Sequence, residues 1–106
     1  MTNHPEAGEK IFKKGEVIYQ QGDYVSAIYD VLYGQVALYV DYHKPTQRLL
    51  NEVEADGFFG IVGFLESRPQ NATAVALEKT ACTVITHENF GHYFQERPAK
   101  IMSIMQ

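Results

Sequence analysis

Short apolar runs, each followed by glycine or other turn residues, fill most of the chain. In residues 35–41 apolar and other side chains alternate with the two-residue period of a strand that buries one face. The segments predicted to be strands are residues 11–12, 17–19, 27–33, 36–40, 48–53, 73–77 and 82–86. Strands spaced this evenly, with glycine-rich turns between them, indicate an antiparallel barrel or sandwich.

The end of the chain changes from the period of a strand to that of a helix. Thr86 or His87 is expected to cap a first helix. Its buried stripe would be formed by Phe90, Tyr93 and Phe94, which lie at positions i, i+3 and i+4. Pro98 ends this helix and can start a second, short one with apolar side chains at Ile101, Ile104 and Met105.

Residues 56–74 are the stretch around which the other segments are arranged. Gly57, Gly60 and Gly63 recur at every third position, and residues 61–65 between strands are compact enough for about one helical turn. The N–H groups that open such a turn favour an anion, typically a phosphate. The alternative is a buried turn that only joins two strands.

Composition bounds the class of protein. A chain of 106 residues and 12.0 kDa is one domain with a real core. A net charge of −4 argues against direct binding of nucleic acid, which needs a basic surface. The single cysteine, Cys82, suits a reducing cytoplasm, and no segment has the length and hydropathy of a signal peptide or a membrane span.

Two ordered motifs resemble the cyclic nucleotide-binding domain family. Residues 22–36 resemble its first signature, a glycine and an acid followed by apolar positions and a glycine-valine end. Residues 56–74 resemble its phosphate-binding cassette, here called the cassette. The resemblance implies a mainly β fold, an antiparallel eight-stranded β-roll (double-stranded β-helix or jelly roll) with short flanking helices. It implies one domain over residues 1–106, with the roll and cassette in residues 11–97 and a truncated C-terminal helix in residues 98–106.

The same resemblance implies a ligand site in the cassette, with cyclic AMP, cyclic GMP or another small phosphate-containing anion as the ligand and no cofactor. Ile61 stands where the family has a glutamate for the ribose, Gln70 where it has an arginine for the phosphate, and Asn71 where it has serine or threonine. Losing a buried charged partner costs roughly 2–5 kcal/mol, so weak or altered binding is expected. The implied site residues are Phe59, Gly60, Ile61, Val62, Gln70, Asn71, Ala72 and Thr73.

Alternatives to a ligand sensor remain. Asp30 replaces an aromatic or aliphatic residue of the first signature, and Arg68 is expected to form an exposed pair with Glu66. A cupin-like metalloenzyme would need a His-x-His pair, which the sequence lacks. With no nucleophile–base pair either, the chain is predicted not to be an enzyme. An interaction module that has lost the ligand and acts through its helices stays open. The segment at residues 98–106 is expected to pack on its own barrel or to make a weak homodimer contact, and the other implied partner is an output-domain protein.

Overall fold

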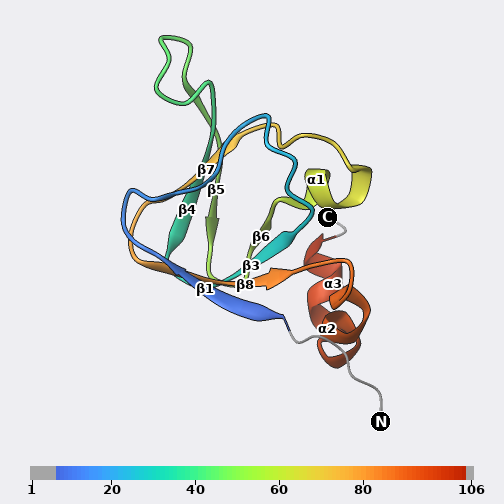
Figure 1. Ribbon diagram of the computed structural model, residues 1–106. Helices are drawn as coiled ribbons and strands as arrows, with labels where there is room; N and C mark the ends of the chain where they lie inside the picture. Colours follow the sequence, from blue (N-terminus) through green and yellow to red (C-terminus); the bar gives the residue numbers. More distant parts are fainter. Residues whose placement is uncertain (1–6, 105–106) are drawn as a thin grey trace.

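Two four-stranded antiparallel sheets form the body of the protein (Figure 1). The computed structural model describes residues 7–104, without the side chain of Ser103. Strand order is β1-β8-β3-β6 in one sheet and β2-β7-β4-β5 in the other. The strands are β1 (Gly8–Phe12), β2 (Val17–Tyr19), β3 (Ile28–Tyr33), β4 (Gln35–Val40), β5 (Arg48–Glu54), β6 (Phe58–Phe59), β7 (Thr73–Ala76) and β8 (Thr80–Ile85). The predicted β-roll is confirmed.

Three short helices flank the sheets, as predicted. They are α1 (Ile61–Glu66), α2 (Phe90–Glu96) and α3 (Pro98–Ile104). Helices α2 and α3 lie together at one end of the roll, whereas the β4–β5 hairpin extends from the other (Figure 1). Helix α1 lies between β6 and β7 in the chain, so the cassette occupies the connection from one sheet to the other.

The core between the sheets combines aromatic rings with small side chains. The rings of Tyr29 and Phe59 stack with centroids 4.8 Å apart, and Tyr19 lies within 6.0 Å of Phe59. The facing strand β7 contributes Ala74 and Ala76, both fully buried. Small residues on β7 leave room for the rings, which bury much more apolar surface per residue.

A second apolar cluster joins the helices to the roll. It contains Ile28, Phe64, Ile85, Tyr93 and Phe94. Two of these come from the predicted stripe of α2, and Phe64 comes from α1. Full burial of side chains of this size stabilises the fold by roughly 1.5–3 kcal/mol each, so packing holds these short helices in place.

Three local expectations differ from the structure. In β4 both Val36 and Ala37 are fully buried, so the strand does not alternate between a buried and an exposed face. Helix α2 begins after Asn89. Neither Thr86 nor His87 caps it, because residues 86–89 form a turn in which the Thr86 N–H donates to Asn89 Oδ1 at 2.8 Å, and Asn89 is the residue at the cap position. Ile101 is 36% exposed, and Met105 lies outside the described residues.

Cys82 is a core residue, as predicted. Its side chain is fully buried in β8, and burial followed by the nearby Asp30 charge raises the pKa of the thiol to about 12. Over residues 7–104 no three histidine, cysteine, aspartate or glutamate side chains gather as metal ligands would. None of the helices in that range has the length and hydropathy to span a membrane.

Candidate functional site

Gly60 makes the sharp turn that starts the cassette helix α1. Its φ of 82° lies in the left-handed region, and a Cβ there would come within 2.8 Å of the Ala27 carbonyl oxygen. Only glycine fits this position without strain. The helix ends at Ser67, also left-handed with φ 52°. Just after the helix, Arg68 Nη1 lies 3.5 Å from Glu66 Oε1, and the two side chains form the predicted exposed pair.

The Gln70 side chain holds the cassette against the rest of the fold through two hydrogen bonds, which are here called the closure. This side chain is buried, and Nε2 donates to the Val25 carbonyl at 3.1 Å and to the Gly60 carbonyl at 3.3 Å. Its backbone N–H donates to the Asp23 carbonyl at 2.8 Å. Gln70 thus ties the start of α1 to the loop before β3. The amide nitrogen that sequence reasoning offered to a phosphate already has two acceptors in the protein.

A cavity of about 340 Å³ lies beside this closure and is here called the cassette cavity. It is bounded by α1, β6, the β4–β5 hairpin and β2. The lining residues are Tyr19, Leu38, Leu50, Asn51, Phe58, Phe59, Gly60, Ile61, Val62, Gln70 and Asn71. Small-molecule sites are typically 300–1,000 Å³ and mostly apolar, so the cavity is at the small end of that class.

The structure brings together six of the eight residues named from the sequence. Phe59, Gly60, Ile61, Val62, Gln70 and Asn71 line the cassette cavity. Ala72 is buried and does not line it. Thr73 lies toward a different cavity, and its hydroxyl accepts from the Gln21 N–H at 3.0 Å. Ala72 and Thr73 therefore support the backbone of the site.

Sequence reasoning missed five lining residues: Tyr19, Leu38, Leu50, Asn51 and Phe58. Four of them lie on β2, β4 and β5, outside the cassette. The antiparallel register places Leu38 opposite Asn51, which brings the hairpin side chains to one place. A correct prediction of how β4 and β5 pair across their connecting loop would have identified the hairpin residues.

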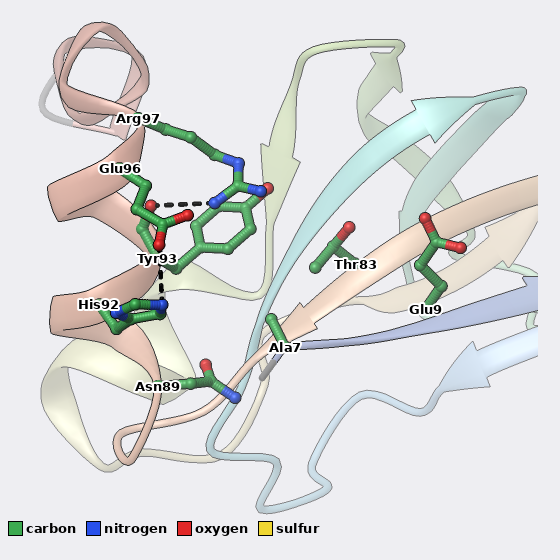
Figure 2. A pocket seen from close by; sticks show the side chains of 8 residues that line it. All are labelled: Ala7, Glu9, Thr83, Asn89, His92, Tyr93, Glu96 and Arg97. Carbon is green, nitrogen blue, oxygen red and sulfur yellow. Dashed lines mark hydrogen bonds and ion pairs between the residues drawn. The ribbon is translucent and has the colours of Figure 1, made fainter. Parts of the chain in front are cut away.

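A larger cavity, about 430 Å³, lies between α2 and strands β1 and β8 (Figure 2). Its charged groups lie beside partners of the protein itself. His92 Nε2 is 2.9 Å from Glu96, and the Arg97 guanidinium lies 4.1 Å from the Tyr93 ring centroid. Glu9 adds another carboxylate to the lining. With two carboxylates and one guanidinium, this lining does not form a cradle for an anion.

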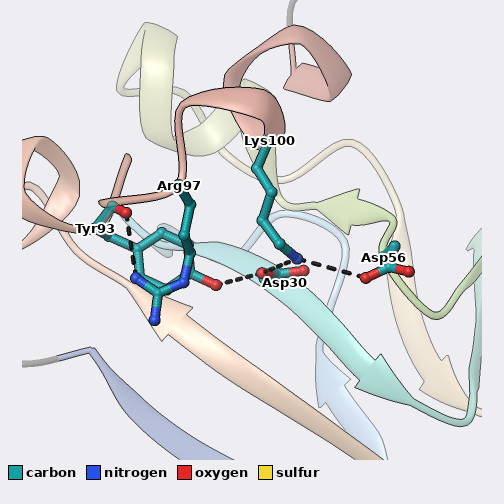
Figure 3. Close-up of polar contacts among 5 residues, drawn as sticks. All are labelled: Asp30, Asp56, Tyr93, Arg97 and Lys100. Atoms are coloured by element: carbon teal, nitrogen blue, oxygen red, sulfur yellow. Dashed lines mark hydrogen bonds and ion pairs between the residues drawn. The ribbon is translucent and has the colours of Figure 1, made fainter. Parts of the chain in front are cut away.

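Asp30 anchors the C-terminal helices to the roll (Figure 3). Its fully buried carboxylate accepts a short hydrogen bond from the Tyr93 hydroxyl, and Lys100 Nζ lies 3.0 Å from Oδ2. Lys100 also lies 3.5 Å from the exposed carboxylate of Asp56. Asp30 Oδ1 has no hydrogen-bond partner within the described part of the chain. The residue that departs from the first signature therefore holds α2 and α3 at once.

Comparison with known proteins places this arrangement in a family. The cyclic nucleotide-binding domain family matches residues 9–97. Over 74 residues the chain is 32% identical to a cGMP-dependent protein kinase of Plasmodium berghei (strain Anka), covering 70% of the chain and 8% of the kinase. Over 82 residues it is 29% identical to a cAMP-dependent protein kinase regulatory subunit of Dictyostelium discoideum, covering 74% of the chain and 25% of the subunit.

The fold comparison agrees. The catabolite activator protein of Thermus thermophilus superposes with a TM-score of 0.79 at 24% identity, over 93% of this chain and 46% of that one. The chain belongs to the cyclic nucleotide-binding domain family. It spans a quarter or less of the length of these two curated relatives.

Gly63 is predicted to be indispensable for the cassette closure. A Cβ there would meet the Gln70 side-chain amide and would lie 2.8 Å from the Val25 carbonyl oxygen. Overpacking of this kind costs typically about 1–3 kcal/mol, so Gly63→Ala should lower the free energy of unfolding by that amount. Gly91→Ala is the matched control, because it is also helical and has open space around it. It should be neutral or slightly stabilising. Urea unfolding of both variants checks this, and equal stabilities would contradict it.

The stability that Tyr93 contributes, through its hydrogen bond between α2 and the roll, should depend on pH in the alkaline range. Burial first, and then the hydrogen bond to Asp30, raise the pKa of Tyr93 from 10.0 to about 12. Because the folded-state pKa is raised, this contribution is fully present below the unfolded pKa of 10.0 and is lost as pH rises through about 12. The stability difference between the parent and Tyr93→Phe should therefore shrink over that window. Urea unfolding at several pH values measures it, with exposed Tyr24→Phe as control. A constant difference would refute the assignment.

Proposed function

We propose that the chain is a regulatory sensor domain that binds a small molecule in the cassette cavity, and that its binding of cyclic AMP and cyclic GMP is weak. The observation that carries this is the Gln70 side chain. It lies where the family's phosphate-binding arginine is expected, and its amide nitrogen donates to the Val25 and Gly60 carbonyls. With Ile61 beside it, the described lining offers neither a cation for a phosphate nor a carboxylate for a ribose.

Relatives named for cGMP and cAMP support a cyclic nucleotide as the ancestral ligand class. A missing charge partner costs roughly 2–5 kcal/mol, which is about one to three orders of magnitude in affinity or more. Isothermal titration calorimetry of the pure protein with cyclic AMP and cyclic GMP tests the proposal. We expect dissociation constants well above 1 μM for both. A value below about 1 μM, which corresponds to −8.2 kcal/mol, would contradict weak binding.

We also propose that the domain has no catalytic turnover and acts in the cytoplasm on an output domain or partner protein. In support, the only cysteine is buried with a raised pKa and the described residues contain no metal-ligand cluster. Both curated relatives are much longer than the matched segment. Hydrolysis of a cyclic nucleotide, abolished by a single substitution in the cassette cavity, would overturn the proposal.

A second candidate function, a protein-interaction module, is favoured by one observation. Helix α3 exposes Ile101 and Met102, which are 36% and 60% exposed. Apolar side chains on a terminal helix suit a weak contact with a second copy or a partner. Sedimentation of the parent and of the Ile101→Ser/Met102→Ser variant separates the cases. Self-association that the variant loses supports this contact, and a tight dimer that the variant keeps argues against it.

A further inference from the structure

The cassette cavity has a lining without formal charge. Among the described residues that border it there is no lysine, arginine, histidine, aspartate or glutamate. Tyr19 has the one ionisable side chain, and burial raises its phenol pKa far above the ordinary value, so it is uncharged at neutral pH. Arg68, the basic residue within the cassette, pairs with Glu66 and does not border the cavity.

The polar side chains that line the cassette cavity suit an uncharged ligand. The side-chain nitrogen of Gln70 is committed to the two carbonyls of the closure. Asn51 and Asn71 are exposed at the border and offer amides, which can each donate and accept. An anion placed here would lose its hydration and gain no opposite charge, which is strongly unfavourable. An uncharged ligand with one or two hydrogen-bonding groups avoids that cost.

Aromatic side chains form part of the apolar lining. Phe58 is half-buried, and Phe59 belongs to the ring stack with Tyr29. Leu38, Ile61 and Val62 complete the apolar surface. Flat rings bury large areas against such side chains at low entropic cost. A volume of about 340 Å³ limits the occupant to a small molecule.

Resting on the proposed sensor function, the geometry points to an uncharged, flat aromatic or heteroaromatic compound as the ligand class of the cassette cavity, with a phosphate group acting against binding. In a site that binds phosphate, a nucleotide binds more tightly than its nucleoside. Here the order is reversed, since the charged phosphate of the nucleotide would weaken the complex. The ligand's ring packs against Phe58, Ile61 and Val62, and its polar edge meets the Asn51 and Asn71 amides.

Two matched ligand pairs test the inference on the full chain: adenosine against cyclic AMP, and 2-naphthol against 2-naphthoate. Calorimetry should show the neutral member of each pair binding at least about tenfold more tightly. Tighter binding of either anion would overturn the inference and leave the proposed sensor function in place. Absence of binding by all four compounds at millimolar concentration would overturn both and favour the interaction module.

Variants locate the site. Val62→Trp should fill the cavity and weaken binding of the neutral compounds at least about tenfold, because Val62 borders it. Leu65→Trp is the matched control on the same helix. Leu65 is 60% exposed and does not line the cavity, so this variant should leave affinity unchanged. Leu50→Trp, on the rim and 48% exposed, repeats the test if Val62→Trp fails to fold. Neutral compounds that bind all three variants equally would overturn the assignment.

A reversal experiment adds the missing charge without disturbing the closure. Asn71 is exposed on the cavity rim and, unlike Gln70, is not buried in the closure. Asn71→Arg should narrow or reverse the preference of adenosine over cyclic AMP, whereas the neutral isostere Asn71→Leu should keep it. An unchanged preference in Asn71→Arg would contradict the charge argument.

Discussion

The double variant Ile61→Glu/Gln70→Arg is expected to bind cyclic AMP at least about tenfold more tightly than the parent. Each substitution supplies a charge-assisted hydrogen bond worth roughly 1.5–3 kcal/mol, and about 1.4 kcal/mol is enough for tenfold. Both positions border the cassette cavity. Calorimetry on the double variant, the single variants and the parent measures the gain.

The same double variant should be less stable without ligand. Arginine directed into the cavity no longer donates to the Val25 and Gly60 carbonyls, which the Gln70 amide now satisfies. An unsatisfied buried acceptor costs about 1–3 kcal/mol. Gln70→Leu alone is the control, since it loses the closure and gains no charged partner for the nucleotide, and its affinity should not rise. A well-folded double variant with no gain in affinity would show that the cavity does not admit the nucleotide.

Lys100→Met is expected to lower the free energy of unfolding by about 3 kcal/mol. Removing one partner of a buried ion pair costs roughly 3–5 kcal/mol, because the other charge stays buried. The lower end applies because the Lys100 side chain is 29% exposed. Asp30 would keep only its bond from Tyr93. Chemical denaturation at neutral pH measures the loss, and exposed Lys79→Met serves as the control for removal of one positive charge.

Replacing both partners of the ion pair with apolar residues should restore most of the lost free energy of unfolding. In Asp30→Leu/Lys100→Met no charge is left buried, and such apolar replacements are often neutral or stabilising. The stability of Asp30→Leu alone should lie between the two, because this variant leaves without a partner only the partly exposed lysine and the Tyr93 hydroxyl. If Lys100→Met is as stable as the Lys79→Met control, then Lys100 does not hold α3 to the roll.

Most strands and the three helices were predictable because each rests on a local pattern, whereas β6 was not predicted and β1 begins three residues before the predicted strand. Alternation marked β4, the stripe at Phe90, Tyr93 and Phe94 marked α2, and Pro98 marked the start of α3. The exposed Glu66–Arg68 pair is likewise local. Burial within β4 was not predictable, because Ala37 is covered by side chains whose positions depend on the pairing of distant strands.

The orientation of the site residues was beyond local reasoning. Gln70 turns inward because an acceptor lies on Val25, 45 residues earlier, and because Gly63 leaves it room. Asp30 finds its partners 63 and 70 residues later, in Tyr93 and Lys100. A sequence shows that an unusual residue stands in a motif, but only the assembled fold shows whether that residue faces a ligand or another part of the chain.

The Gln70 closure also determines which contacts of the molecule respond to the surrounding electrolyte. A neutral amide neither titrates nor attracts counter-ions, so salt leaves the Gln70 closure itself unaffected. Helix α3 is held by the ion pairs of Lys100 with Asp30 and Asp56, and Lys100 is partly open to solvent. Ions screen such accessible charges over a Debye length of roughly 8–10 Å at ordinary ionic strength. Increasing salt should therefore loosen α3, while the hydrogen bonds of the Gln70 closure stay in place.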